Sequence, residues 1–365
     1  MRAVVFTNPG EPVRVREVDL DRPGPGEVTV TIAAAGVCHS DLHVRRGDWA
    51  VRAPLVMGHE GAGVVTDVGP SVSDLSEGDH VVLSWIAPCG QCRYCLAGHP
   101  ARCKVAATVV GPGGVLMDGT SRLSLDGRRI YHYLGVSSFA ERAVVPASGA
   151  IRIRDDAPLD VVALVGCAVA TGVGAVLNTA AVEPGAVVAV IGCGGVGLSV
   201  VQGARLAGAG RIIAVDLRQE KTALAARLGA TDQVDANAAD PLDAVRELVP
   251  DGVDYAFDAI GLTSTTSQAI AMLGLGGAAV VVGLPPDGTT VSFEPLALAE
   301  ADQRILGSNY GSVRPAKDIP ALVDRFMDGD LQLNELVSAR LPLETAARAL
   351  DDLEAGQAVR TLLIP

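Results

Sequence analysis

Four of the seven cysteines in this chain crowd into one short segment with the pattern C-x2-C-x2-C-x7-C: Cys89, Cys92, Cys95 and Cys103. In a chain without an export signal, clustered cysteines are more often metal ligands than disulfide partners. The first residues, MRAVVFTNPGEP, show no apolar run ahead of a cleavage site, so we expect a cytoplasmic protein. Four thiolates from one lobe can close a tetrahedral site, which predicts a structural zinc ion.

An iron–sulfur cluster is the competing interpretation of this lobe. Bacterial ferredoxins also begin with C-x2-C-x2-C, but their next cysteine follows after three residues and precedes a proline. Here that position holds His99, followed by Pro100. The departure favours zinc over the cluster, and it leaves His99 as an alternative to Cys103 for the fourth ligand.

Two further segments and one cysteine carry reactive side chains: Cys38-His39-Ser40-Asp41-Leu42-His43, then Gly58-His59-Glu60, and Cys167. These segments are dense in side chains that can bind a metal ion or exchange a proton. Taken singly, each has an ordinary structural interpretation, Cys167 as a small core residue and His59 as a hydrogen-bonded turn residue. The distances along the chain do not by themselves bring these residues together.

A dinucleotide-binding motif, G-x-G-x-x-G, follows the apolar run AVVAVI and precedes a helical segment; its residues are Gly192, Gly194, Gly195, Val196 and Gly197. The glycines permit a tight turn, close approach of a pyrophosphate and close helix–strand packing. Asp216 ends the next apolar run, where its carboxylate would bind the ribose hydroxyls and repel a 2′-phosphate. The motif therefore predicts NAD rather than NADP, although Arg218 nearby could soften that preference.

Two kinds of pattern divide the chain. The first 150 residues contain short β-type runs broken by Gly and Pro, typical of a compact barrel-like β unit. From about residue 186, strands alternate with helices, which predicts an α/β unit with a doubly wound parallel sheet. The last 50 residues predict two amphipathic helices and a closing strand, VRTLLI.

Composition limits the function. The 365 residues include 49% apolar types, enough for a large core, and the net charge of −13 argues against nucleic acid and anionic membranes as partners. The uncharged stretch 161–182 contains glycines, threonines and an asparagine, so we expect buried helix and loop there rather than a membrane span.

In combination, the motifs GVCHSDLH, MGHEGAGVV, the four-cysteine lobe, GCAVATG, IGCGGVG and VRTLL resemble the zinc-dependent alcohol dehydrogenases of the medium-chain dehydrogenase/reductase superfamily. The likeness runs through the whole chain, and the long segment between Cys103 and Cys167 is similar to the dimeric branch. The resemblance implies a GroES-like catalytic domain, residues 1–168 and 310–365, with the structural-zinc lobe at 88–104. It also implies a Rossmann domain at 169–309 and a homodimer paired along the sheet edge near residues 304–310.

Residue by residue, the resemblance makes Cys38, His59 and Cys167 the ligands of a second, catalytic zinc. Ser40 and His43 match the groups that relay the alcohol proton, Asp41 matches the acid that orients the imidazole, and Glu60 matches an acid beside the metal. The resemblance further implies contacts to the cofactor from four residues: His39, Thr171, Lys221 and Arg360. It also implies that Trp49 and Trp85 line the substrate pocket. His39 stands where some relatives have arginine on the pyrophosphate.

The expected activity is reversible hydride transfer between a primary alcohol and NAD, giving an aldehyde. The lobe CGQCRYC and the stretch PALVDRFMDGDL are also similar to thiol-dependent formaldehyde dehydrogenases of the mycothiol or glutathione type. A nicotinoprotein that retains its NAD is a third interpretation. Some relatives have lost zinc and chemistry, but the presence of all three catalytic ligands with Ser40 and His43 argues against that here.

Overall fold

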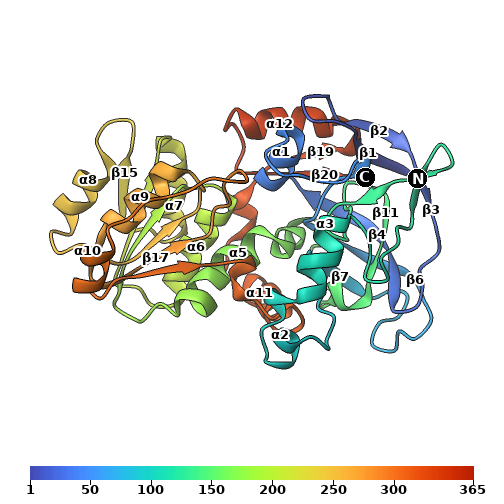
Figure 1. Ribbon diagram of the computed structural model, residues 1–365, viewed down its shortest axis with the longest axis horizontal. Helices are drawn as coiled ribbons and strands as arrows, with labels where there is room; N and C mark the ends of the chain where they lie inside the picture. Colours follow the sequence, from blue (N-terminus) through green and yellow to red (C-terminus); the bar gives the residue numbers. More distant parts are fainter. The chain divides into compact units, whose positions relative to one another are not determined.

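The computed structural model describes residues 1–365, which form two compact units, Met1–Ala168 with Arg314–Pro365, and Val169–Val313 (Figure 1). Both ends of the chain therefore belong to the first unit. The first boundary falls after Ala168, and the second lies at 313/314, four residues beyond the 309/310 boundary that the resemblance implies. Together the units hold a mainly antiparallel β part and a parallel α/β part, as expected from the sequence.

A seven-stranded sheet organises the first unit, with the order β12-β7-β6-β4-β20-β19 and β11 beside β4. All of its pairs are antiparallel except β19 with β20. The strands are β4 (Glu27–Gly36), β6 (Gly61–Val68), β7 (His80–Leu83), β11 (Arg142–Pro146), β12 (Ala150–Arg152), β19 (Val337–Pro342) and β20 (Arg360–Ile364). Because β20 pairs with the end of β4, the last residues of the chain lie beside the segment that begins at Val37.

Two small sheets complete the β part of this unit. One has the order β10-β5-β1-β2 and the other β3-β8-β9. Their strands are β1 (Arg2–Phe6), β2 (Arg14–Glu17), β3 (Asp19–Leu20), β5 (Leu55–Val56), β8 (Leu123–Leu125), β9 (Arg128–Arg129) and β10 (Tyr131–His132). Alternating apolar residues of these strands are buried in common cores, which explains the β-type runs of the sequence.

The helices of the first unit are short: α1 (His39–Arg46), α2 (Arg93–Leu96), α3 (Gly111–Gly113), α4 (Leu159–Val162), α11 (Pro315–Met327) and α12 (Ala346–Glu354). In α12, the buried residues Ala346, Ala349, Leu350 and Leu353 follow the spacing of one helical face. Its other face carries Asp351, which accepts a hydrogen bond of 2.6 Å from Arg45 of α1. The C-terminal helix thus braces the helix that follows Cys38.

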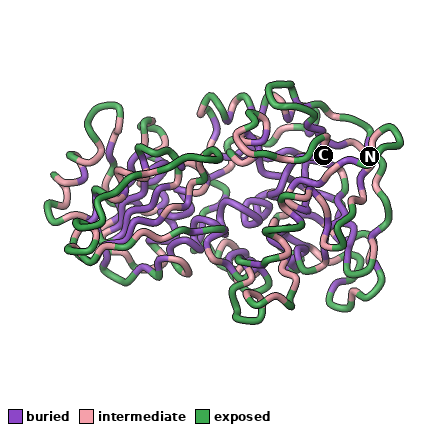
Figure 2. Tube along the Cα trace, in the orientation of Figure 1, coloured by how far each residue is buried: buried purple, intermediate pink, exposed green.

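The second unit is a parallel sheet with the order β15-β14-β13-β16-β17-β18. Its strands are β13 (Val187–Ile191), β14 (Arg211–Asp216), β15 (Asp232–Asp235), β16 (Val253–Asp258), β17 (Leu273–Val281) and β18 (Arg304–Gly307). Its helices are α5 (Ala168–Gly174, whose first residue closes the first unit), α6 (Gly195–Leu206), α7 (Gln219–Leu228), α8 (Pro241–Leu248), α9 (Thr263–Ala271) and α10 (Pro295–Glu300). The strands are largely buried (Figure 2), and their order confirms the doubly wound sheet.

The uncharged stretch 161–182 forms short, mostly buried helical segments: α4, a 3₁₀ turn Ala163–Gly166, α5 and a π-type turn Ala175–Ala180. No single helix of the structure is long and apolar enough to cross a membrane. One bent pair, Leu159–Gly166 with Ala168–Ala180, meets the criteria of length and composition alone.

Candidate active site

Three residues that are far apart in the sequence converge in the first unit: Cys38, His59 and Cys167. Their ligand atoms all lie within 4.8 Å of one another, and all three side chains are buried. Cys38 follows β4 and caps α1, His59 lies between β5 and β6, and Cys167 lies between the turn Ala163–Gly166 and α5. The pairing of β4 with β6 brings Cys38 and His59 together, and the turn Ala163–Gly166, which packs on these strands, brings Cys167 to them.

One carboxylate holds two of these residues in place. Asp41 Oδ2 accepts a hydrogen bond of 2.9 Å from the Cys38 N–H, and its Oδ1 lies 3.4 Å from His59 Nδ1. Burial raises the pKa of Asp41. Burial also works against the charged form of His59, but Asp41 and Cys38 raise the pKa of this imidazole to about 10. Both ring nitrogens of His59 are buried without a hydrogen-bond partner; Nδ1 faces Asp41, which leaves Nε2 for a metal ion.

Arg360 brings a buried positive charge to the same place. Its guanidinium donates to the carbonyl of Val37 over 3.2 Å, and Nη2 lies 3.6 Å from Cys38 Sγ. A hydrogen bond from Cys167, with the charge of Arg360, lowers the pKa of the Cys38 thiol well below its usual value despite burial. These two contacts favour the thiolate form of Cys38, which is the form that binds a metal ion. The role of Arg360 at the cofactor pyrophosphate stays a prediction.

Glu60 is buried between Arg360 and the backbone N–H of Ala168, both in the first unit. Its Oε2 accepts a hydrogen bond of 3.0 Å from the Ala168 N–H, and its Oε1 lies 3.6 Å from Arg360 Nε. Burial raises its pKa to about 7, although Arg360 opposes this shift. A Cβ on Gly36 would lie 1.9 Å from Glu60 Oε1, so only glycine at the end of β4 leaves room for the carboxylate.

The donor set fits a catalytic zinc ion. Two cysteines and one histidine leave a tetrahedral zinc with one open position for a substrate oxygen. The partnerless His59 Nε2 and the thiolate character of Cys38 both supply what the metal needs. Asp41 supplies the acid that fixes the imidazole tautomer.

Ser40 and His43 lie on α1, directly after the first ligand. Ser40 Oγ is 3.8 Å from Cys38 Sγ, and the carbonyl of Ser40 accepts a hydrogen bond of 3.1 Å from the Tyr133 hydroxyl. The Tyr133 ring stands edge-on to His59, with 5.3 Å between ring centroids. Its place beside the site was not expected, because no sequence signal links residue 133 to Ser40.

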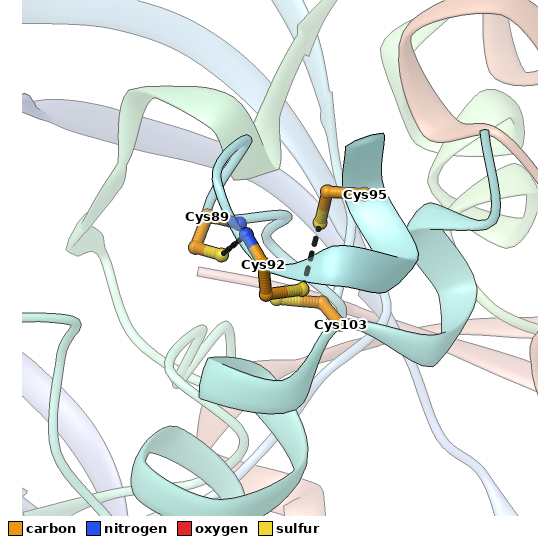
Figure 3. A group of neighbouring side chains, drawn as sticks. All are labelled: Cys89, Cys92, Cys95 and Cys103. Atoms are coloured by element: carbon orange, nitrogen blue, oxygen red, sulfur yellow. Dashed lines mark hydrogen bonds between the residues drawn. The ribbon is translucent and has the colours of Figure 1, made fainter. Parts of the chain in front are cut away.

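The four-cysteine lobe is assembled as the spacing predicts. The ligand atoms of Cys89, Cys92, Cys95 and Cys103 lie within 4.8 Å of one another, and their sulfur atoms converge (Figure 3). Backbone N–H groups of Cys95 and Lys104 lower the pKa of Cys92 to about 6, which favours the thiolate that binds metal. Cys103, not His99, completes the set, and all seven cysteines of the chain are free of disulfides. The lobe fits a closed structural zinc site.

The glycine motif of the second unit begins after β13 and opens α6. Gly192 has a φ of +94°, and a Cβ on Gly197 would lie 1.7 Å from the carbonyl oxygen of Gly192. A Cβ on Gly194 would meet nothing within 4 Å, so this position faces open space at the start of α6. Asp216 ends β14, where its two oxygens accept hydrogen bonds from the backbone of Cys193 (2.7 Å) and Arg218 (3.0 Å). The turn fits a dinucleotide with its pyrophosphate at the helix N-terminus.

The remaining predicted residues are distributed between the units. His39 is the first residue of α1 and Trp49 follows the end of this helix. Trp85 follows β7 and packs against the core of the first unit. Thr171 is buried in α5 and Lys221 lies in α7 of the second unit. Their contacts with substrate or cofactor stay predictions.

Comparisons with known proteins agree with the metal sites and the dinucleotide turn described above. The family model described as alcohol dehydrogenase GroES-like domain matches residues 24–155, and the model described as zinc-binding dehydrogenase matches residues 195–328. The S-(hydroxymethyl)glutathione dehydrogenase of Paracoccus denitrificans is 38% identical, covering 100% of this chain and 99% of its own.

Solved structures show the same likeness. An alcohol dehydrogenase zinc-binding domain protein from Burkholderia ambifaria has a TM-score of 0.95 and 39% identity, covering 100% of this chain and 98% of the other. Benzyl alcohol dehydrogenase from Acinetobacter calcoaceticus has a TM-score of 0.94 and 33% identity with the same coverage. With its two metal-ligand sets and its dinucleotide turn, the chain belongs to the zinc-dependent medium-chain dehydrogenases, whose cofactors are NAD and zinc.

Proposed function

We propose that this dehydrogenase oxidises a primary alcohol to an aldehyde with NAD, reversibly. The observation that carries the proposal is the buried Cys38–His59–Cys167 cluster with the hydroxyl of Ser40 beside it. When bound, zinc acts as a Lewis acid that acidifies an alcohol hydroxyl, and NAD accepts the hydride.

The residues of the chain hold the metal ion and transfer the proton of the alcohol hydroxyl. Ser40 would take up the hydroxyl proton of the alcohol while giving up its own hydroxyl proton towards His43, because a serine hydroxyl both accepts and donates hydrogen bonds. His43, one helical turn further along α1, passes a proton to solvent. Asp41 keeps His59 in the tautomer that presents Nε2 to the metal. Glu60, with a pKa of about 7, changes its charge near neutral pH beside Arg360.

NAD is favoured over NADP by Asp216. Its carboxylate is fixed at the end of β14 by two backbone N–H groups, so it stands ready for the ribose hydroxyls. A 2′-phosphate would bring two negative charges against it. The expected measurement is a turnover with NAD that exceeds the turnover with NADP at equal concentration, and Asp216→Ala should narrow the difference.

A thiol adduct of formaldehyde is the second candidate substrate. The observation in its favour is that S-(hydroxymethyl)glutathione dehydrogenases of Paracoccus denitrificans and Escherichia coli are 38% and 39% identical over 99–100% of this chain. Such an adduct is itself a primary alcohol, so the same residues would serve it. Rates with formaldehyde plus glutathione or mycothiol, compared with rates for simple and aromatic alcohols, decide between the two.

We also propose a homodimer. The strand β18 lies at one edge of the parallel sheet and pairs only with β17, and an unpaired edge is a template for another strand. The same unit exposes large apolar side chains, among them Leu275, with an exposed fraction of 86%, and Leu296, with 62%. Light scattering of the purified protein should give twice the mass of 37.3 kDa, and a single-chain mass would contradict the proposal.

A further inference from the structure

His43 contacts two residues just beyond the end of its helix, Asp48 and Trp49. Its Nδ1 lies 2.8 Å from Asp48 Oδ2, and its ring stacks on Trp49 with 4.4 Å between centroids and 23° between planes. No motif of the sequence analysis includes Asp48. We propose that Asp48 is the positioning residue of the proton relay, a proposal that rests on the proposed function of His43.

Local backbone geometry creates the contact. The helix α1 ends at Arg46, and Gly47 takes a left-handed conformation with φ of +81°. The Asp48 N–H then donates to the carbonyl of His43 over 2.9 Å, which turns the chain back onto the helix. A Cβ on Gly47 would also lie 2.9 Å from Pro9 Cβ, so glycine is needed here twice. The sequence H-x3-G-D-W therefore places Asp48 and Trp49 in contact with the imidazole of His43.

The pairing decides which nitrogen of His43 exchanges the proton. An ionised aspartate accepts hydrogen bonds and donates none, so His43 Nδ1 must carry the hydrogen. The neutral ring then has its lone pair on Nε2, which becomes the nitrogen that takes up the relayed proton. The carboxylate of Asp48 stabilises the imidazolium that forms, and the indole face of Trp49 stabilises the same charge. When Nε2 releases its proton to solvent, the neutral tautomer is restored.

The test compares Asp48→Asn with the wild type, zinc-loaded and supplied with NAD and a primary alcohol. We expect the single-turnover rate of NADH formation to fall at least tenfold, with alcohol KM and zinc content unchanged, because general base groups contribute about 10²–10⁴-fold. Asp48→Glu should recover part of the rate. Asp351→Asn is the matched control, since it removes an acid bonded to Arg45 of the same helix and does not touch His43.

Two further measurements separate positioning from mere structural support. In a His43→Gln background, Asp48→Asn should cause no further loss of rate; an equal loss there would show that Asp48 acts elsewhere and would overturn the proposal. Nitrogen-15 spectra should show the His43 hydrogen on Nδ1 in the wild type and a shift of the neutral ring towards Nε2–H in Asp48→Ala, whose side chain has no acceptor. The signal is assigned by its loss in His43→Gln.

Failure of the two proposals is distinguishable. A wild type that oxidises no alcohol or thiol adduct refutes the proposed function, while the tautomer still reports whether Asp48 fixes His43. An active wild type whose Asp48→Asn variant keeps the same rate, and whose Asp48→Ala variant keeps the same tautomer, refutes the role of Asp48.

Discussion

The double role of Asp41 leads to a sharp prediction about the catalytic metal. In Asp41→Asn, the side chain keeps one acceptor oxygen and gains an amide that can only donate. One of the two contacts, with the Cys38 N–H or with His59 Nδ1, must then set a donor against a donor. His59 can escape the conflict only by moving its hydrogen to Nε2, which removes the nitrogen that the metal needs.

The expected loss follows from this geometry. Removing the partner of a metal-binding histidine lowers metal affinity about 10- to 100-fold, which equals about 1.4–2.8 kcal/mol at 1.4 kcal/mol per factor of ten. Neither contact of Asp41 involves the four-cysteine lobe, so that site should keep its affinity. The variant should therefore lose one zinc per chain at chelator concentrations that the wild type withstands.

A chromophoric chelator, titrated against wild type and variant with zinc counted by elemental analysis, measures both sites in one sample. The cysteine lobe is the internal control, and Asp351→Asn controls for loss of a carboxylate that contacts α1. Thermal unfolding of both variants reports any loss of fold. If Asp41→Asn releases its zinc at the same chelator concentration as the wild type, the assigned role of Asp41 is wrong.

Three more predictions concern other parts of the chain. Gly194→Ala should leave the unfolding temperature unchanged but weaken NAD binding as measured by calorimetry. Gly197→Ala should instead destabilise the second unit, because its Cβ would lie 1.7 Å from a carbonyl oxygen. Equal effects of the two substitutions on stability and NAD binding would contradict these roles. Burial lowers the pKa of His132 from 6.5 to about 3, so the unfolded chain binds this proton first. The stability that depends on neutral His132 is therefore present above pH 6.5 and is lost as the pH falls towards 3, at up to about 1.4 kcal/mol per pH unit. Urea unfolding of His132→Asn should show a free energy of unfolding that falls less steeply with acid than that of the wild type. Equal slopes for the two proteins would refute this. Trp85→Ala should extend turnover to bulkier alcohols, and an unchanged substrate profile would exclude Trp85 from the pocket.

The sequence patterns predict correctly those parts of the fold that are formed by contiguous segments of the chain. The alternation after residue 186 and the glycines at 192–197 predict β13, α6 and the parallel sheet, because each strand–helix unit is contiguous. The cysteine lobe is also contiguous, and the structure resolves the choice of fourth ligand in favour of Cys103. The role of these segments can be predicted without knowing which distant residues contact them.

The catalytic cluster could be joined from sequence only by resemblance. Cys38 and His59 meet because β4 pairs with β6, and Cys167 joins them because the turn Ala163–Gly166 packs on these strands. Neither the strand pairing nor this packing follows from a local pattern. Arg360 shows the same limit: the pairing of β20 with β4 brings its guanidinium to the carbonyl of Val37, which is 323 residues away in the sequence. Asp48 was missed for another reason, since its contact with His43 depends on the left-handed turn at Gly47.

The central claim is that the buried Cys38–His59–Cys167 cluster serves NAD-dependent alcohol oxidation. The most direct measurement follows the NADH absorbance band of the zinc-loaded protein with NAD and a panel of primary, aromatic and secondary alcohols, together with formaldehyde plus glutathione or mycothiol. The account predicts sustained NADH formation with at least one primary alcohol or thiol adduct, and its loss in Ser40→Ala with zinc content intact. Absence of NADH formation with every substrate, in protein that holds two zinc ions per chain, would contradict it.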